Sequence, residues 1–271
     1  MAKKLALAVD LDKCMRCYSC FVACKQENNV DDGIQFTRVY TVGPTIYKQY
    51  YWKPTIHFLS LQCNHCDSPA CAVVCPVHAI TKRADGIVFL DENLCIGCQK
   101  CVAACPYGIP QFNAGKFVAE KCNMCTQRID QGLTPSCVKH CLTHARVFGD
   151  LNDPNSDVSK LLAAGGLPYH PEYGTSPTTR YLGLPTPLMA VAAIDGAKDE
   201  VLESCTVTLT DLLSGDTQKL TSDEWGDIQF EGISRNRTYS LKAEKDGYLP
   251  KFLGVVNFTE DVLVEMKLFP K

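Results

Sequence analysis

Sixteen of the seventeen cysteines lie in four runs of four, and in every run three residues separate the last two cysteines. The first and third runs have two, two and three intervening residues: Cys14, Cys17, Cys20, Cys24; and Cys95, Cys98, Cys101, Cys105. The second and fourth runs widen the middle gap to four and eleven residues: Cys63, Cys66, Cys71, Cys75; and Cys122, Cys125, Cys137, Cys141. Sulfur at this density must bind metal or pair as disulfides, so it constrains the fold more than any other feature.

The spacing of the first and third runs is that of bacterial ferredoxins, in which three cysteines hold one [4Fe–4S] cubane and the fourth ligates the neighbouring cluster. If the two middle runs exchange their fourth cysteines, and the two outer runs do the same, one two-cluster unit is nested inside another. The pattern therefore predicts four [4Fe–4S] clusters, at site I (Cys14, Cys17, Cys20, Cys141), site II (Cys24, Cys122, Cys125, Cys137), site III (Cys63, Cys66, Cys71, Cys105) and site IV (Cys75, Cys95, Cys98, Cys101).

Two other uses of cysteine compete with this interpretation. Zinc sites usually take two Cys-x-x-Cys pairs twelve or more residues apart, and they do not need the third and fourth cysteines of each run. Disulfides suit short secreted chains, whereas this sequence has 271 residues and shows no signal-peptide pattern. Cys205 stands apart, because its alternation with Val207 and Leu209 predicts a buried thiol rather than a ligand.

Charge divides the chain into two parts. The formal net charge is −3, but residues 1–150 carry 16 Lys and Arg against 12 Asp and Glu, while residues 151–271 carry 11 against 18. Each oxidised cluster with four thiolates has a net charge of about −2, so nearby basic side chains can stabilise a reduced cluster and raise its potential. The candidates are Lys13, Arg16, Lys25, Lys100, Lys121, Arg128 and Lys139. The alternative is a nucleic-acid-binding face, although no base-stacking or groove-reading motif accompanies it.

The sequence predicts an α+β fold with tandem nested ferredoxin-like units, followed by a small C-terminal antiparallel β-sandwich. We expect residues 1–164 to form the cluster domain, with an inner unit at about 58–115 and an outer unit from 1–57 and 116–164. Its strands are expected at residues 4–12, 86–91 and 116–119, each leading into a cysteine loop and a short helix.

Residues 165–187 are rich in Pro and Gly, which predicts an extended linker. Residues 188–271 alternate apolar and polar side chains between turn signals, which is typical of a sandwich. Its strands are expected at residues 188–193, 205–209, 228–230, 239–243, 252–256 and 262–268. A carbohydrate-binding or adhesive role for this domain would need an exposed aromatic platform, and Trp225, the one candidate, is expected in the core.

The segment between the first two runs is rich in aromatic side chains: Phe36, Tyr40, Tyr47, Tyr50, Tyr51, Trp52 and Phe58. They either shield the clusters from water or anchor a partner subunit, and the sequence favours neither role. No stretch of eighteen uncharged apolar residues occurs, so no membrane span is expected. We therefore predict a cytoplasmic location, or export together with a folded partner that bears the signal.

The order of the runs and the eleven-residue gap before Cys137 resemble the iron–sulfur subunits of molybdopterin oxidoreductases of the dimethyl sulfoxide reductase family, across residues 1 to about 165. The stretch Tyr173–Pro177, Tyr181 and the C-terminal domain resemble most, in layout, the small subunits of pyrogallol–phloroglucinol transhydroxylase and of catechol dehydroxylases. That transhydroxylase subunit holds three clusters, whereas this chain keeps all sixteen cysteines, which favours net electron delivery. Gly226–Ile233 resembles transthyretin-like and carboxypeptidase-regulatory sandwiches.

The resemblance implies that this is an electron-transfer subunit and that substrate chemistry takes place on a partner. The implied partner is a large subunit carrying molybdopterin guanine dinucleotide with molybdenum or tungsten, in a heterodimer or a higher oligomer of it. The expected substrate is phenolic, and the alternative is a respiratory reductase of dimethyl sulfoxide, arsenate or a similar acceptor. On this chain no nucleophile with a base, phosphate loop or carboxylate pair is evident, so no substrate site is expected. Histidines near the ligands should donate hydrogen bonds or pack rather than bind iron: His65, His78, His140 and His144.

Overall fold

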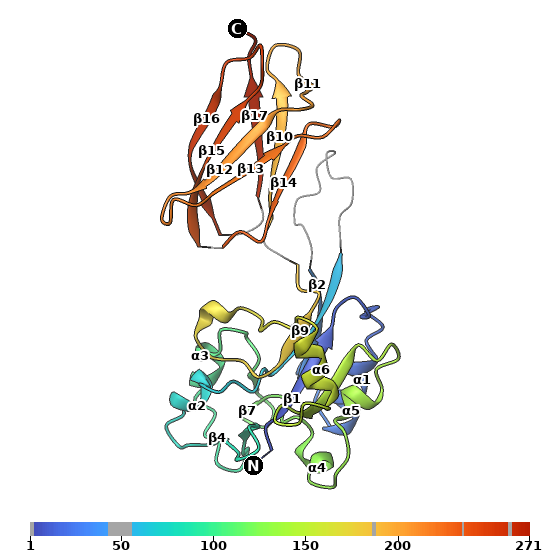
Figure 1. Ribbon diagram of the computed structural model, residues 1–271. Coiled ribbons are helices and arrows are strands. Elements are labelled where there is room, and N and C mark those ends of the chain that lie inside the picture. The colour runs from blue at the N-terminus through green and yellow to red at the C-terminus, as the bar shows by residue number, and fades with distance from the viewer. Residues whose placement is uncertain (1–2, 43–55, 186–187, 235, 260–261) are drawn as a thin grey trace. The chain divides into compact units, whose positions relative to one another are not determined.

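The computed structural model describes residues 3–42, 56–185, 188–234, 236–259 and 262–271 (Figure 1). These residues form two compact units. The first, the cluster unit, takes residues 3–41 and 57–184, and the second, the C-terminal unit, takes the described residues from 188 onward. Within the aromatic segment, Tyr47, Tyr50, Tyr51 and Trp52 lie outside the described residues, whereas Phe36 is buried and Tyr40 is exposed.

A three-stranded sheet forms the centre of the cluster unit. Its strands lie in the order β8 (Arg146–Asp150), β1 (Leu5–Asp10) and β9 (Arg180–Leu182). Strand β8 runs antiparallel to β1, and β9 runs parallel to it. The alternation of the first residues predicts one buried face, but all six residues of β1 are buried. Both faces are covered, because Leu7 packs with Met124 on one side and Ala8 packs with Val158 of helix α6 (Asp157–Ala163) on the other.

Short helices follow the cysteine loops. They are α1 (Ser19–Glu27), α2 (Ala70–Val73), α3 (Lys100–Ala104), α4 (Thr126–Ile129), α5 (Ser136–Lys139) and the 3-10 turn η1 (Pro171–Tyr173). The third cysteine of each run lies in α1, α2, α3 or α5. Helix α1 packs against α5, and α2 packs against α3, which is the order in which the cysteine runs are predicted to pair. No helix in the described part of the chain is long and apolar enough to cross a membrane.

Three two-stranded antiparallel pairs complete the cluster unit: β2 (Thr37–Val42) with β3 (His57–Gln62), β4 (Ile80–Lys82) with β5 (Val88–Leu90), and β6 (Gln111–Asn113) with β7 (Val118–Glu120). Strands β5 and β7 lie where the sequence predicts strands before the third and fourth runs. β7 starts two residues later than expected, because the chain turns at Gly115 and Phe117 adopts a left-handed φ of 57°.

Residues 165–184, which the sequence predicts as part of an extended linker at 165–187, group with the cluster unit. Thr175, Thr178 and Tyr181 are at most 6% exposed. Thr178 Oγ1 donates to the carbonyls of Asn64 and His65 at 3.0 Å, and the Tyr181 hydroxyl donates to Asn64 Oδ1 at 3.1 Å. The Thr178 hydroxyl satisfies two backbone carbonyls of the second cysteine loop and the Tyr181 hydroxyl holds a side chain of that loop, so residues 175–182 pack across it.

The C-terminal unit contains two four-stranded sheets. The first has β10 (Leu188–Asp195) paired with β11 (Glu200–Val201), β14 (Asp227–Glu231) and β17 (Val262–Leu268). The second has the order β13–β12–β15–β16, with bounds Thr217–Thr221, Thr206–Asp211, Arg237–Glu244 and Lys251–Phe258. The predicted sheet pairing is wrong at one point, because β10 and β17 are parallel rather than antiparallel.

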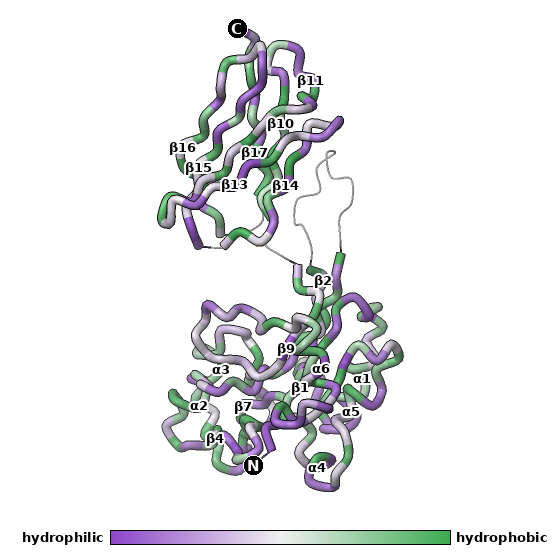
Figure 2. The backbone as a smooth tube through the Cα atoms, in the orientation of Figure 1, coloured by the Kyte–Doolittle hydropathy of each residue, from purple (hydrophilic) through white to green (hydrophobic). Residues whose placement is uncertain are grey.

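One buried cluster of side chains is shared by both sheets. Phe230 of β14 and Met266 of β17 pack in the same core as Leu241 of β15 and Phe258 of β16. The alternation that places these residues inward can be followed in Figure 2, and β12 alternates half-buried and buried positions. Trp225 is 46% exposed, contrary to its prediction as a core residue, because it lies in the turn before β14.

Candidate iron–sulfur centres

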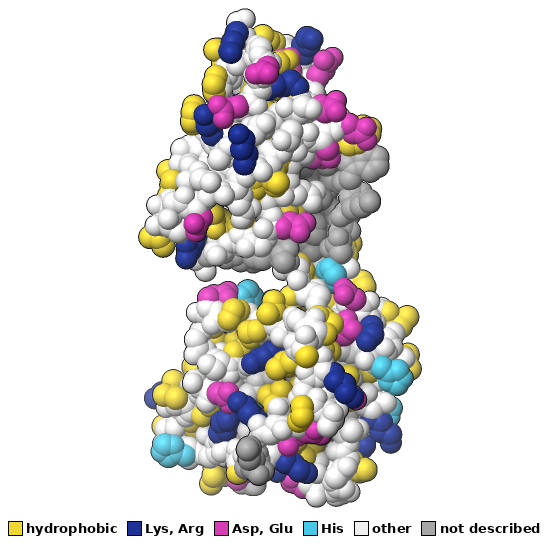
Figure 3. Space-filling view, in the orientation of Figure 1, with side chains coloured by type: hydrophobic (Ala, Val, Ile, Leu, Met, Phe, Trp, Pro, Cys, Tyr) yellow, Lys and Arg dark blue, Asp and Glu magenta, His cyan; other side chains and the backbone are white. Residues whose placement is uncertain are grey.

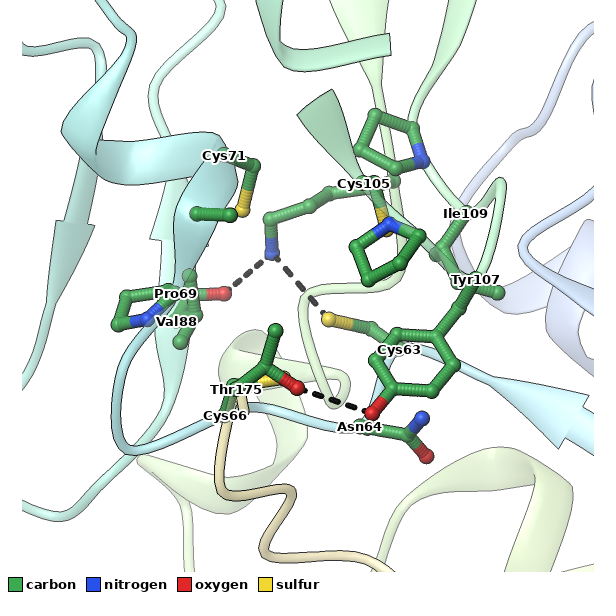
Figure 4. A pocket seen from close by; sticks show the side chains of 14 residues that line it. Cys63, Asn64, Cys66, Pro69, Cys71, Val88, Cys105, Tyr107, Ile109 and Thr175 are labelled. Atoms are coloured by element: carbon green, nitrogen blue, oxygen red, sulfur yellow. Dashed lines mark hydrogen bonds between the residues drawn. The ribbon is translucent and has the colours of Figure 1, made fainter. Parts of the chain in front are cut away.

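The four cysteines predicted for site III line one pocket with an empty volume of about 380 Å³ (Figure 4). Cys63 and Cys66 come from the loop after β3, Cys71 from α2, and Cys105 from the end of α3. The remaining wall is mostly apolar, and one side is closed by a hydrogen bond of 2.9 Å between the hydroxyls of Tyr107 and Thr175. Four sulfurs in an apolar enclosure are the donor set of an iron–sulfur cluster, so the residues fit that group.

Two thiols of site III have raised pKa values. Burial, followed by the nearby Cys63 and Cys105 sulfurs, raises the pKa of Cys66 to about 11 and that of Cys71 to about 12. Thiols with such pKa values lose their protons when a metal binds them.

Site IV has the same construction. Its four cysteines line a second pocket, of about 320 Å³, together with Ile80, Leu90 and other apolar side chains. The backbone N–H of Ala119 donates to Cys95 Sγ at 3.3 Å. Gly97 is required in this loop, because its φ is 67° and a Cβ atom there would lie 2.6 Å from the carbonyl oxygen of Phe117.

Site II is buried throughout, with its four cysteines at most 7% exposed. Asn28 Nδ2 lies 3.7 Å from Cys24 Sγ and 3.6 Å from Cys125 Sγ. Burial raises the pKa of Cys24 to about 12, and the adjacent Cys137 and Cys125 sulfurs raise it further. The structure therefore brings the last cysteine of the first run to the fourth run.

Site I lies nearer the surface. Burial raises the pKa of Cys14, and the Cys20 and Cys141 sulfurs are close enough to raise it too. Cys17 is exposed, and a hydrogen bond to the Ser19 side chain lowers its pKa. Cys17 and Cys141 line the same open surface hollow. The structure thus gathers the site I cysteines from both ends of the cluster unit.

Arg146 connects sites I and II. It is 3% exposed, and its guanidinium donates to Gln62 Oε1 at 2.8 Å and to Cys137 Sγ at 3.5 Å. Burial opposes its charge, but the Cys137 and Cys20 sulfurs attract it more strongly, so the pKa of Arg146 is raised. One buried cation therefore lies between a cysteine of each site.

His65 connects sites II and III. It is fully buried in the loop between Cys63 and Cys66, and its Nδ1 accepts the N–H of Val88 at 3.0 Å. Burial, together with Lys121 and Lys82, holds the pKa of His65 well below its usual range. A neutral ring that accepts at Nδ1 carries its proton on Nε2, and Nε2 lies 3.8 Å from Cys122 Sγ. His65 therefore donates toward a sulfur of site II, as its predicted supporting role requires.

These contacts place the sites in the order I, II, III, IV. Arg146 joins the first pair and His65 the second. Sites III and IV share the packed helices α2 and α3, because each helix contains a cysteine of one site and is followed by a cysteine of the other. The sulfurs at the two ends of the series, Cys17 and Cys98, are both exposed.

The basic residues near the ligands differ in burial. Lys13, Arg16, Lys100 and Lys139 are exposed, Lys25 and Arg128 are half-buried, and Lys121 is 3% exposed. On the face shown in Figure 3 the Lys and Arg side chains are scattered rather than gathered in a stripe, which does not favour a nucleic-acid surface. Nearness to a cysteine ligand in the sequence does not show that Lys121 is buried while the other basic residues are more exposed. It also does not identify Arg146 or Thr175 as neighbours of the sites.

All seventeen cysteines are free, so disulfides do not form. In the described part of the chain, no group of three or more His, Cys, Asp or Glu side chains is placed to hold a single metal ion. Cys205 is fully buried in the C-terminal core, as predicted. The backbone N–H groups of His78 and His144 donate to the carbonyls of Cys75 and Cys141, and His140 Nδ1 contacts Ser136.

Comparison with known proteins places these sites in a family. Residues 54–151 match the model of the 4Fe-4S dicluster domain. A tetrathionate reductase subunit of Salmonella typhimurium is 40% identical over 198 residues, covering 70% of this chain and 78% of its own length. The arsenate respiratory reductase iron-sulfur subunit of a Shewanella species is 34% identical, covering 66% of this chain and 96% of its own. A sulfite dehydrogenase subunit of Allochromatium vinosum is 38% identical, covering 66% and 82%.

These relatives are named as subunits of two reductases and a dehydrogenase, and the arsenate reductase subunit is named an iron–sulfur subunit. The chain therefore carries [4Fe–4S] clusters, transfers electrons and has a catalytic partner subunit. It belongs to the family of iron–sulfur subunits of molybdopterin oxidoreductases.

Proposed function

We propose that this chain holds four [4Fe–4S] clusters, at sites I to IV, and relays electrons between a molybdopterin-containing catalytic subunit and a respiratory donor or acceptor. A [4Fe–4S] cluster supplies one-electron redox chemistry. The observation that carries the proposal is the connected series of cysteine sites, linked by Arg146, His65 and the helix pair α2 and α3. Thiolate ligation at all sixteen cysteines accounts for every cysteine in the cluster unit.

Two lines of evidence bear on the substrate of the partner: the names of the relatives, and the resemblance of the C-terminal domain to subunits of phenolic enzymes. The relatives give the stronger support. The relatives are named for tetrathionate, arsenate and dimethyl sulfoxide reduction and for sulfite oxidation. We therefore favour the respiratory-reductase alternative, with a small oxidised sulfur or arsenic compound as the substrate of the partner. Molybdopterin guanine dinucleotide belongs, in this proposal, to the partner alone, and the complex is cytoplasmic or exported with that partner.

Iron analysis of anaerobically purified protein tests the number of clusters. We expect about 16 irons per chain from four cubanes, with a brown colour that dithionite bleaches. A colourless protein with about one zinc per four cysteines would point to the zinc scaffold instead. A value of about 12 irons in an undamaged sample would remove one site from the proposal.

Reoxidation of the complex tests the substrate. The chain is purified with its catalytic partner, reduced with one equivalent of dithionite per cluster, and mixed with tetrathionate, arsenate, dimethyl sulfoxide or pyrogallol. We expect the cluster absorbance to return with one of the first three compounds and not with pyrogallol. The chain without its partner is the control, and it should stay reduced with every compound. Recovery with pyrogallol alone would restore the phenolic alternative.

A further inference from the structure

Lys121 is a buried cation in the wall of the site III pocket, and its bonding shows that it is charged. Its Nζ donates to the carbonyl of Cys122 at 3.0 Å, to the carbonyl of Val88 and to Cys63 Sγ at 3.9 Å. Two of these contacts are the dashed lines that meet at one nitrogen in Figure 4. Two carbonyl oxygens and a sulfur thus surround this nitrogen, which matches the three N–H donors of an ammonium group.

This ammonium group has no carboxylate partner among the described residues. The neighbouring Glu120, also buried, is bound instead by Lys116 at 2.8 Å and by Asn113. A charge that is 3% exposed is costly unless an opposite charge lies near it. The nearest candidates for that opposite charge are the sulfurs of Cys63 and Cys71, whose interaction with Lys121 lowers the pKa of Cys71 against the larger effect of burial.

We infer that Lys121 is the resident counter-cation of site III and sets its reduction potential above that of an otherwise equal site without a buried cation. The inference rests on the proposed occupation of site III by a cluster. Reduction adds one negative charge to the site, and a fixed positive charge in contact with a ligand stabilises the reduced form more than the oxidised form. Because Lys121 is buried, dissolved salt screens this interaction little.

A merely structural role is the competing explanation. Lys121 joins β5, through the Val88 carbonyl, to the loop of the fourth cysteine run. If that were its only role, replacement would lower stability or iron content and leave the potential of site III unchanged. The two roles therefore differ in what they do to a potential measured on fully loaded protein.

The test is a redox titration of the full-length chain followed by electron paramagnetic resonance, with the site III signal identified as the one that changes in Cys66→Ser. In Lys121→Met we expect the midpoint potential of this signal to fall by at least about 59 mV. For a one-electron couple this is a tenfold decrease in the equilibrium constant for reduction. Lys121→Arg keeps the charge, so its site III potential should lie close to the wild-type value. Lys100→Met is the matched control, because Lys100 also neighbours a ligand but is exposed, and its small effect should vanish in high salt.

Iron content separates this inference from the proposed function. Wild-type protein with about four irons fewer than 16 and no signal sensitive to Cys66→Ser would refute the occupation of site III itself. Fully loaded Lys121→Met with an unchanged site III potential would refute the role of Lys121 alone. If Lys121→Met does not load, Lys121→Gln and Lys121→Arg carry the same comparison, and equal potentials in those two variants would also overturn the inference.

Discussion

The exchange of fourth cysteines can be tested on two neighbours in one helix. Cys20 and Cys24 both lie in α1, one turn apart, and both are buried. The assignment nevertheless sends Cys20 to site I and Cys24 to site II, beside Cys137. Each serine variant removes one ligand of four, so each should lose one cluster, and iron should fall from about 16 to about 12 per chain.

Double variants show which cysteines share a site. Cys24→Ser with Cys137→Ser should still contain about 12 irons, because both changes empty the same site, whereas Cys20→Ser with Cys24→Ser should contain about 8. Non-additive losses identify residues that act as one unit. The assay is iron and sulfide analysis of anaerobic protein, with electron paramagnetic resonance to count the remaining signals. The reverse result, with about 8 irons in the Cys24/Cys137 pair and about 12 in the Cys20/Cys24 pair, would refute the exchange.

Three further outcomes concern the C-terminal unit. Phe230→Ala, which empties a fully buried core position, should lower the free energy of unfolding of this unit by about 3–5 kcal/mol in urea and leave the iron content unchanged; a loss under about 1 kcal/mol would contradict the shared core. Burial and the nearby charge of Asp223 raise the pKa of the Asp227 carboxyl to about 6, so the free energy of unfolding should fall as the pH rises from about 4 to 6. Carboxyl NMR should give a lower pKa for Asp227 in Asp223→Asn and an unchanged pKa in a distant Asp→Asn control. Deleting residues 188–271 should preserve all clusters, since every ligand precedes them, but weaken binding to the catalytic partner in gel filtration; unchanged co-elution would exclude a docking role.

The grouping of the cysteines could be predicted because ligand spacing is a covalent property of the chain. In a ferredoxin run the first three sulfurs belong to one site and the fourth to its neighbour, so the spacing indicates which sulfurs meet. Alternating strands such as β12 and β15 were predictable because every second side chain faces the core. β13 was not, because all five of its residues are exposed and no apolar alternation marks it.

The polar residues around the sites could not be predicted from spacing. Arg146 lies in a strand and reaches Cys137 across space, and no local pattern distinguishes it from a surface arginine. Thr175 and Tyr181 lie in a segment whose Pro and Gly content indicates a linker, although their hydroxyls contact Tyr107 after the third run and Asn64 in the second cysteine loop. Their roles depend on partners more than sixty residues away in the sequence, and only the folded chain brings them together.

The central position of β1 sets an order of events during synthesis. Strand β9, which completes the sheet, ends at Leu182, 172 residues after the end of β1 at Asp10. At ribosomal rates this is a delay of roughly 10 to 35 seconds. The fourth run, which is the proposed partner of the first, is complete only at Cys141. The ligands of sites III and IV, in contrast, all lie between Cys63 and Cys105 and emerge together. Iron–sulfur assembly factors in the cell can therefore load the inner sites while the chain is still growing, whereas the outer sites must wait for its later half.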